Sequence, residues 1–367
     1  MVLCLAACAK GGNGVVKPDP VAGKNTAGAA GAALMPEQDP DTELYGYINE
    51  KGDWAIQPKF KKAYSFAENG LARAEDADTG KSGYIDKKGE WAVDPLFGLA
   101  YDFEKNGVAT VEDPESTLLG CIDEKGSWVV APKYNFVFAF SENGLASAED
   151  SESGLYGFIN KKGDWVIEPK FNQAFSFGES DLVAASDPES GLYGYVDEKG
   201  DWVIRPQFVS TFGFGKKGLA EATDSVSESD SDSPLWGYID KKGDWAISPR
   251  FYDASAFGEN GLAAAVDENT QKWGYINEKG DWVIEPQFSD TFGFGENGLS
   301  AVKDADTELI GYINEKGDWV ITPKFAMAFP FTENGLARVQ DSDTMLWGYI
   351  DAKGEWVIAP KFTGTAF

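Results

Sequence analysis

The sequence predicts an all-β protein made of tandem repeats of 37 residues, each holding about three short antiparallel strands. Three observations support this class. Nine tryptophans recur at a nearly constant spacing, and the same hairpin motif surrounds each of them. Hydrophobic residues also make up 43% of the chain and aromatic residues 14%, which is too rich in apolar groups for a disordered polymer.

The tryptophans define the repeat. They stand at Trp54, Trp91, Trp128, Trp165, Trp202, Trp245, Trp282, Trp319 and Trp356. Successive spacings are 37 residues, except for one spacing of 43 that comes from extra residues in a Ser/Asp/Glu-rich tract between Ala222 and Pro234. A fixed period of this length is typical of repeat architectures.

Each unit contains a predicted β-hairpin. In the first copy, residues 46–60 read GYINEKGDWAIQPKF, with Asn49 opening a turn and Gly52 at its fourth position. This is the chemistry of a type I turn followed by a glycine in the left-handed region. A third short strand is expected at residues 70–74, before an acidic turn that leads to the next hairpin.

The register of this hairpin sets Ile48 opposite Trp54 and Gly46 opposite Ile56 on one face. In all nine units the positions of Ile48 and Ile56 hold Ile or Val, and the position between them holds Trp. Uniform residues among different neighbours indicate a recurring packing position. The nine motif tryptophans are therefore predicted to form the core of the repeat.

One position on the other face of the hairpin varies from Ser to Trp, so packing constrains it less. We call it the variable position, and its aromatic members are the candidate interaction face. They are Tyr45, Tyr156, Tyr193, Trp236, Trp273 and Trp347. Packing of these rings within the repeat is the alternative.

Two architectures fit strands repeated at this period: an open superhelical β-array and a closed β-propeller of about eight blades. Nine hairpins are present but only eight of the following strands. The chain ends therefore duplicate each other rather than complement each other, which favours the open array.

The repeated unit resembles the bacterial WG-repeat family. The Trp-Gly pairs typical of that family stand at Trp236-Gly237, Trp273-Gly274 and Trp347-Gly348, and Tyr-Gly pairs stand at Tyr45-Gly46, Tyr156-Gly157 and Tyr193-Gly194. The resemblance covers residues 42–367. It implies a repeat-built protein, often exported or surface-attached, and it implies no common reaction.

The chain before the repeats divides into two predicted segments. Residues 1–8 end in Leu5-Ala6-Ala7-Cys8, which resembles a lipobox whose cysteine becomes acylated. Only seven residues precede Cys8, so the signal is partial, and a chance match is the alternative. Residues 9–41 are rich in Gly, Ala and Pro and are predicted to be a flexible linker. The array of nine hairpin units is expected over residues 42–367.

Composition excludes several functions. The chain carries 60 acidic and 32 basic residues, a formal charge of −28, so phosphate backbones should repel it and nucleic-acid binding is not expected. It contains no histidine, which removes Ser-His-Asp and Cys-His catalysis and histidine-based metal sites. Cys121 occupies a position that is otherwise Tyr or Phe, so it is interpreted as a buried packing thiol.

The carboxylates recur in the turns of every unit, and no unit holds a unique constellation. The sequence therefore predicts no enzyme, no cofactor and no metal site. It predicts an exported binding or scaffolding surface at the bacterial cell envelope, held to the membrane only through a lipid anchor, with an unknown protein or glycan as partner. The alternatives are a polysaccharide-binding module that uses the variable-position aromatics and a calcium-dependent adhesin that uses the acidic turns.

Overall fold

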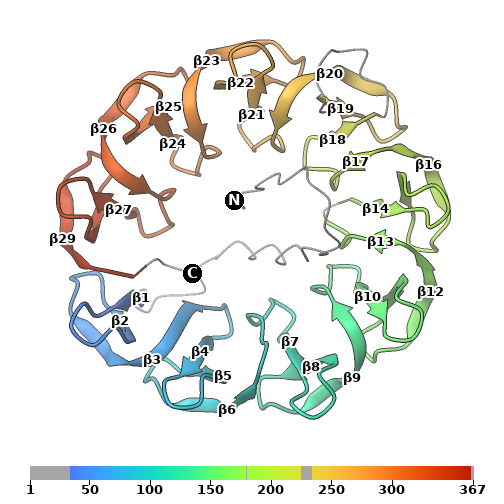
Figure 1. The fold of residues 1–367 in the computed structure, drawn as a ribbon, viewed down its shortest axis with the longest axis horizontal. Helices are drawn as coiled ribbons and strands as arrows, with labels where there is room; N and C mark the ends of the chain where they lie inside the picture. The colour runs from blue at the N-terminus through green and yellow to red at the C-terminus, as the bar shows by residue number, and fades with distance from the viewer. Residues whose placement is uncertain (1–33, 179, 225–233, 365–367) are drawn as a thin grey trace, which may run out of the picture.

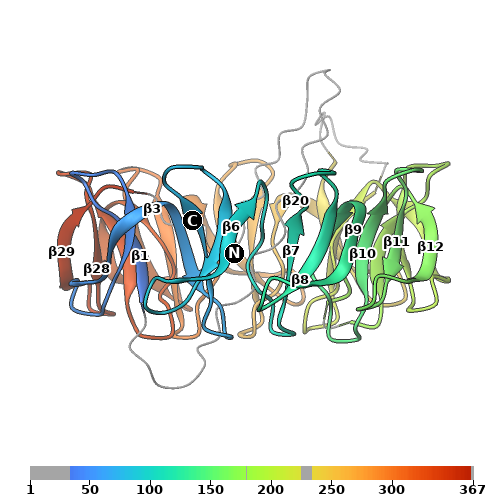
Figure 2. The same ribbon diagram turned by 90° about the horizontal axis from the view of Figure 1, so that it is seen from below.

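The computed structural model describes residues 34–178, 180–224 and 234–364. Within these ranges the chain forms β-strands and no helix, which confirms the all-β prediction. Figure 1 shows the strands arranged as a closed ring, and Figure 2 shows that this ring is shallow.

The ring consists of nine blades, each an antiparallel meander that runs from the centre of the ring to its outer rim. We number the blades 1 to 9 in chain order and call their strands inner, second, third and outer. The second strands are β1 (Met35–Gln38), β4 (Ala72–Asp76), β7 (Val108–Glu112), β10 (Ala146–Asp150), β14 (Val183–Ser186), β18 (Ala220–Thr223), β21 (Leu262–Asp267), β24 (Leu299–Asp304) and β27 (Ala337–Asp341). The third strands are β2 (Tyr45–Ile48), β5 (Ser82–Ile85), β8 (Leu119–Asp123), β11 (Tyr156–Ile159), β15 (Tyr193–Val196), β19 (Trp236–Ile239), β22 (Trp273–Asn277), β25 (Ile310–Asn314) and β28 (Trp347–Ile350).

The outer strands link consecutive blades. They are β3 (Trp54–Phe66), β6 (Trp91–Phe97), β9 (Trp128–Val137), β12 (Trp165–Phe171), β16 (Trp202–Phe208), β20 (Trp245–Ala254), β23 (Trp282–Thr291), β26 (Trp319–Ala328) and β29 (Trp356–Phe362). In the long ones the first half is the outer strand of one blade and the second half is the inner strand of the next, as in β3, which pairs with both β2 and β4. The short strands β13 (Gln173–Ala174) and β17 (Ser210–Thr211) are the inner strands of blades 5 and 6. A blade therefore has an inner strand beyond the three that the sequence predicts.

The predicted hairpin turn is confirmed. The Asn49 N–H donates to the carbonyl oxygen of Asp53 at 2.9 Å, and Gly52 has a φ of 81°. Ile48 pairs with Trp54 as predicted. The left-handed backbone at this turn is the reason that glycine recurs there.

The rest of the predicted register is wrong. Ile56 pairs with Tyr47 and not with Gly46, because the register shifts at a β-bulge in the outer strand. The bulge also explains the glycine of the motif. A Cβ at Gly46 would lie 2.5 Å from the carbonyl oxygen of Ile56 and 2.8 Å from the nitrogen of Pro58, so no larger residue fits.

The core lies between adjacent blades and is built around the ring next to that glycine, an assignment that the sequence prediction missed. Tyr47 and Ile48 are fully buried, and Ile56 is nearly so. The Tyr47 hydroxyl donates to the carbonyl oxygen of Tyr64 at 2.8 Å and thereby fixes the inner strand. The corresponding fully buried rings are Tyr84, Phe158, Tyr195, Tyr238, Tyr275 and Tyr312.

The motif tryptophans lie at the edge of this core rather than wholly inside it. Six of them are partly buried and pack against the buried clusters: Trp54, Trp91, Trp165, Trp202, Trp245 and Trp282. All nine keep part of their surface exposed, and the exposed fraction reaches 40% for Trp128, 37% for Trp319 and 38% for Trp356. Each ring packs edge-to-face on an aromatic ring of the preceding blade; Trp282 and Phe251, for example, have centroids 5.6 Å apart. The tryptophan is uniform because it joins two blades.

The predicted open array is wrong as well, because blade 9 packs on blade 1 through the contacts that join the other blades. Trp54 packs edge-to-face on Phe362, with centroids 5.8 Å apart. Lys361 Nζ donates to the carbonyl oxygen of Gly52 at 2.8 Å. Equivalent bonds from a lysine to a turn glycine lie at other junctions. The ring is therefore closed, and it has nine blades rather than about eight.

Closure depends on β1, which lies in the segment predicted to be a linker. Met35 pairs with Ile48, as Ala72 pairs with Ile85 one period later. The array therefore starts at residue 34 or before, and the boundary at residue 42 is wrong. Residues 1–33, which include the predicted signal, Cys8 and most of the linker, lie outside the described residues.

A buried ion pair seals the ring between the first and last blades. Arg338 on β27 donates to both carboxylate oxygens of Glu37 on β1, at 2.7 and 2.8 Å. The Tyr349 hydroxyl donates to the same carboxylate at 2.7 Å. Glu37 is inaccessible to solvent, and its position holds Ala or Val in the other blades. The acidic residue at this position therefore departs from the repeat only in blade 1, where the two ends of the ring meet.

We expect the substitution Arg338→Met to destabilise the ring strongly, because it leaves the Glu37 carboxylate buried without its cation. Loss of one partner of a buried pair costs about 3–5 kcal/mol, which should lower the midpoint of urea denaturation. The matched control is Lys303→Met in the exposed pair of Lys303 with Glu308, which should cost below about 1 kcal/mol.

The double variant Glu37→Ala/Arg338→Met should recover part of that loss, since alanine is the usual residue at this position. Equal denaturation midpoints for Arg338→Met and Lys303→Met would show that the seal does not stabilise the ring.

Candidate functional site

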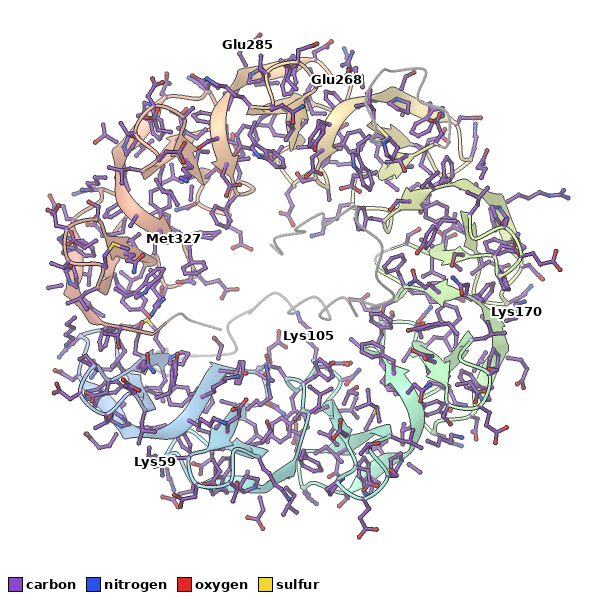
Figure 3. All side chains as sticks on the ribbon, in the orientation of Figure 1. Lys59, Lys105, Lys170, Glu268, Glu285 and Met327 are labelled. Carbon is purple, nitrogen blue, oxygen red and sulfur yellow. The ribbon has the colours of Figure 1, made fainter. Side chains whose placement is uncertain are left out.

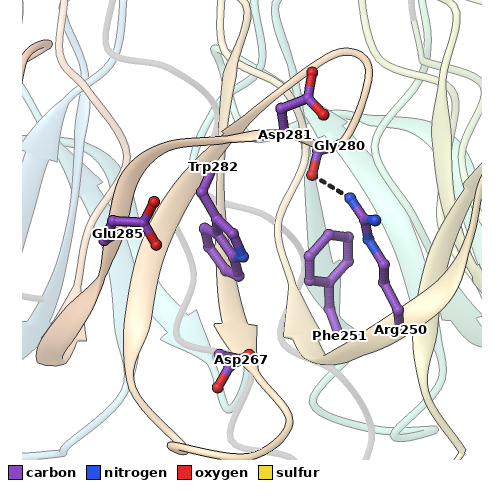
Figure 4. Close-up of a pocket in the computed structure, with 7 residues that line it drawn as sticks. All are labelled: Arg250, Phe251, Asp267, Gly280, Asp281, Trp282 and Glu285. Carbon is purple, nitrogen blue, oxygen red and sulfur yellow. Dashed lines mark hydrogen bonds between the residues drawn. The ribbon is translucent and has the colours of Figure 1, made fainter.

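The junction between blades 6 and 7 forms a groove on the outer rim (Figure 4). It has a volume of about 330 Å³. The outer strand of blade 6 supplies Arg250 and Phe251. Blade 7 supplies Asp267, Gly280, Asp281, Trp282 and Glu285. We call this surface, and its equivalents at the other junctions, the rim grooves.

The groove combines one aromatic ring with charged groups. Figure 4 shows Trp282 between Phe251 and the side of the groove that bears Glu285. Arg250 donates to the carbonyl oxygen of Gly280, which fixes its guanidinium at one end. Asp281 and Glu285 are exposed at the rim, and Figure 3 shows Glu285 on the outer margin of the ring.

The same parts recur around the rim. An edge-to-face pair of a motif tryptophan with a preceding aromatic ring stands at each junction, with centroid distances from 5.3 to 6.4 Å. A lysine that reaches the turn glycine of the next blade accompanies the pair at Lys170, Lys324 and Lys361. The sequence contains this information, because Lys before Phe and Asp before Trp recur in the motif. A prediction that places the tryptophan wholly in the core does not reveal this groove.

The predicted interaction face at the variable position is mostly used for packing inside the blade. Tyr45 and Trp347 are buried. Tyr156, Tyr193, Trp236 and Trp273 are partly exposed. Trp236 stacks on Phe212 of the inner strand, with centroids 5.4 Å apart. The structure therefore does not bring the six residues together on one open surface.

The acidic turns use their carboxylates internally. Asp76 accepts hydrogen bonds from the backbone N–H and the hydroxyl of Thr79, at 2.8 and 2.7 Å, and these bonds lower the pKa of its carboxyl. Asp304 is held in the same way by Thr307. Among the residues that the structure describes, no group of three or more acidic or cysteine side chains is placed to hold a metal ion.

Besides Glu37, the partly buried Glu104 and the buried Glu221 break the repeat. Burial raises the pKa of Glu104 to about 7, and its carboxylate accepts the Phe140 N–H from the next blade at 2.9 Å. Burial, with a smaller contribution from the charge of Asp253, raises the pKa of Glu221 to about 7. In blade 2 the position of Glu221 holds Arg73, which pairs with Asp102 at 3.1 Å. In blade 6 an acidic residue therefore stands where blade 2 has a cation.

Cys121 is a buried thiol, as predicted. It lies 3.7 Å from the hydroxyl of Thr110, and burial raises its pKa to about 12. A thiol with such a pKa is neither a nucleophile nor a metal ligand near neutral pH. Cys8, the predicted acylation site, lies beyond the part of the chain that the structure describes.

The closed ring of blades with three or four described strands each, and its repeated rim, define a β-propeller-like repeat protein. The family model described as "WG containing repeat" matches residues 45–77, 83–113, 120–150, 156–186, 193–223, 236–270, 273–306, 310–343 and 347–366. The chain therefore belongs to the WG-repeat family, as the sequence resemblance predicts. The family identifies no ligand.

Comparison with other known proteins adds little to this assignment. No curated protein sequence matches the chain. Solved structures with similar folds include Hsv2p of Kluyveromyces lactis (10% identity, TM-score 0.36, covering 69% of this chain and 97% of that one) and the dihydro-heme d1 dehydrogenase NirN (10%, 0.46, 96% and 78%). Streptogramin B lyase is a third (11%, 0.36, 74% and 90%). At these scores no functional argument rests on them.

In the region described, no helix has the length and apolar character needed to cross a membrane.

The stability of the ring should fall as pH rises from about 4.5 to about 8, because the folded chain keeps a proton on Glu221 that an unfolded glutamate has already lost in this range. This contribution is present below the unfolded pKa and is lost as pH rises through the folded pKa of about 7. We expect Glu221→Gln to raise the denaturation midpoint at about pH 8, by the equivalent of roughly 1–3 kcal/mol, and to change it little at about pH 4.5.

The control is Glu296→Gln, which removes an exposed carboxylate and tests for a general effect of the net charge. If both variants shift the midpoint equally at both pH values, burial of Glu221 is not the cause.

Cys121 should resist alkylation by iodoacetamide in the folded protein at about pH 8 and should react fully once the chain is unfolded in urea, because only the thiolate reacts. Peptide mass spectrometry would measure the modified fraction. Rapid modification of Cys121 in the folded ring would contradict its burial.

Proposed function

We propose that this protein is a non-catalytic binding or scaffolding ring at the bacterial cell envelope, attached to the membrane through an acylated Cys8. The observation that carries the binding function is the repetition around the rim of a partly exposed tryptophan that packs on an aromatic ring of the preceding blade. A surface that repeats weak sites gains strength when its partner is itself repetitive, because later contacts form intramolecularly. The rim grooves are the binding surface in this proposal.

The distribution of acidic groups supports a role without catalysis. A catalytic carboxylate must reach its substrate. The glutamates that depart from the repeat, Glu37, Glu104 and Glu221, are buried or partly buried. Glu37 is inaccessible and paired with Arg338. Glu221 is buried, and Glu104 caps the N–H of Phe140. The exposed carboxylates recur from blade to blade, so no blade is singled out for a reaction.

The envelope location rests on the lipobox-like sequence before Cys8 and on the family resemblance. Mass spectrometry of the native protein should find a lipid on Cys8 at the new amino terminus. An unmodified peptide that spans Leu5 to Ala9 would contradict the anchor, and the binding function would then require another route to the envelope.

Binding can be tested with the full chain carrying Cys8→Ser, so that lipid does not contribute. We expect this protein to sediment with washed envelope fragments, and the triple variant Trp128→Phe/Trp319→Phe/Trp356→Phe to sediment roughly tenfold less, because it loses contact area at three of the repeated sites. Phenylalanine retains an edge-to-face partner for the preceding blade. Circular dichroism and the melting temperature would verify that the ring is intact.

The matched control substitutes the same residue type at the variable position, in Trp236→Phe/Trp273→Phe/Trp347→Phe. This triple variant should sediment like the parent. If the parent does not sediment with the envelope, the proposed function is wrong.

A further inference from the structure

The rim grooves have the chemistry of a carbohydrate subsite. A sugar ring has an apolar face of C–H groups and an edge of hydroxyls, so it requires an aromatic surface beside hydrogen-bonding groups. The groove between blades 6 and 7 offers both. Trp282 is partly exposed, and Asp281, Glu285 and Arg250 surround it. The carboxylates accept hydroxyl protons, and the guanidinium donates to sugar oxygens.

The charge of the grooves selects among polysaccharides. Asp267, Asp281 and Glu285 stand against one cation, Arg250, and the whole chain has a formal charge of −28. An anionic polymer would be repelled as it approached this surface. An uncharged polysaccharide meets no such barrier, and its hydroxyls match the acceptors in the groove.

The rim is poorly suited to a protein partner. Its exposed apolar side chains are separated by charged ones, as Val283 is followed by exposed Glu285 and Val166 by exposed Glu168. A protein interface of usual strength buries a continuous apolar centre. Addition of an extended peptide to the open edge of an outer strand is also disfavoured, because a β-bulge interrupts each edge.

The repetition of the motif tryptophans indicates a polymer rather than a single sugar. Each junction carries the edge-to-face aromatic pair, so a chain of repeated units can contact several tryptophans at once. One sugar in one shallow groove would bind weakly, and several linked contacts raise the overall affinity. We propose that the rim grooves bind an uncharged polysaccharide, with the motif tryptophans as stacking platforms. This inference rests on the proposed function and specifies its ligand class.

The test uses the full chain with Cys8→Ser and three insoluble probes: cellulose and chitin as uncharged polymers, and cross-linked polygalacturonate as an anionic one. We expect the protein to sediment with at least one uncharged polymer and not with polygalacturonate. The rim variant Trp128→Phe/Trp319→Phe/Trp356→Phe should lose roughly tenfold in apparent affinity. The matched variant Trp236→Phe/Trp273→Phe/Trp347→Phe should bind like the parent.

A second variant separates hydrogen bonding from stacking. Asp281→Asn/Glu285→Gln changes two exposed groups of one groove and should weaken binding to the uncharged polymer modestly, with Glu296→Gln, which lies outside the grooves, as its control.

Other outcomes overturn the inference in distinguishable ways. Loss of binding only in the variable-position variant would place the carbohydrate site there and would refute the rim. The protein could instead sediment with envelope fragments in a way that depends on the rim tryptophans but is abolished when the fragments are treated with protease. The ligand would then be a protein, so the proposed binding function would stand and the polysaccharide inference would be wrong. If the protein binds neither the polymers nor the envelope fragments, the proposed function and the polysaccharide inference are both wrong.

Discussion

The edge-to-face contact between a motif tryptophan and an aromatic ring of the preceding blade is the interaction on which the ring depends. Such pairs contribute about 0.5–1.5 kcal/mol each beyond the area they bury. The contact is made at every junction, including the one between Trp54 and Phe362. Because it joins blades at their outer edges, it leaves part of each indole in solvent. The residue that closes the ring is therefore also the residue available to a ligand.

Closure imposes a further requirement at the chain ends. A closed ring needs a complete first blade, and β1 supplies the second strand of that blade. Residues near the carboxyl terminus reach the inner side of blade 1, where Gly364 lies against Gln38 and Tyr45. The ion pair of Glu37 with Arg338 specifies which ends meet, since a charged residue at this alanine position is compatible only with its partner across the seam. A mispaired ring would leave both charges buried without compensation.

Deviations from the repeat divide into two kinds. Those at Glu37, Glu104 and Glu221 are buried or partly buried and act on stability, with Glu37 and Glu104 satisfied by partners and the pKa of Glu221 raised by burial and by Asp253. On the rim, the motif tryptophan recurs in every blade and an acidic residue precedes it in all blades except blade 3, whereas the position of Glu285 varies and holds Arg205 in blade 5. The proposed binding function therefore rests on the tryptophans that all blades share, as is typical of a multivalent surface.

The sequence by itself determined the strand content, the period, the hairpin turn and the family, because these follow from local backbone chemistry such as the left-handed glycine at Gly52 and from the identity of repeated residues. It did not determine whether the array closes, because β1 has the divergent sequence MPEQ and its strand character comes only from pairing with β2. It also placed Trp54 and its equivalents wholly in the core, since uniform residues look the same whether they lie inside a core or at its edge. Only the tertiary structure decided this, because the β-bulge at Ala55 shifts the register. Tyr47 then packs on the following blade and Trp54 on the preceding one.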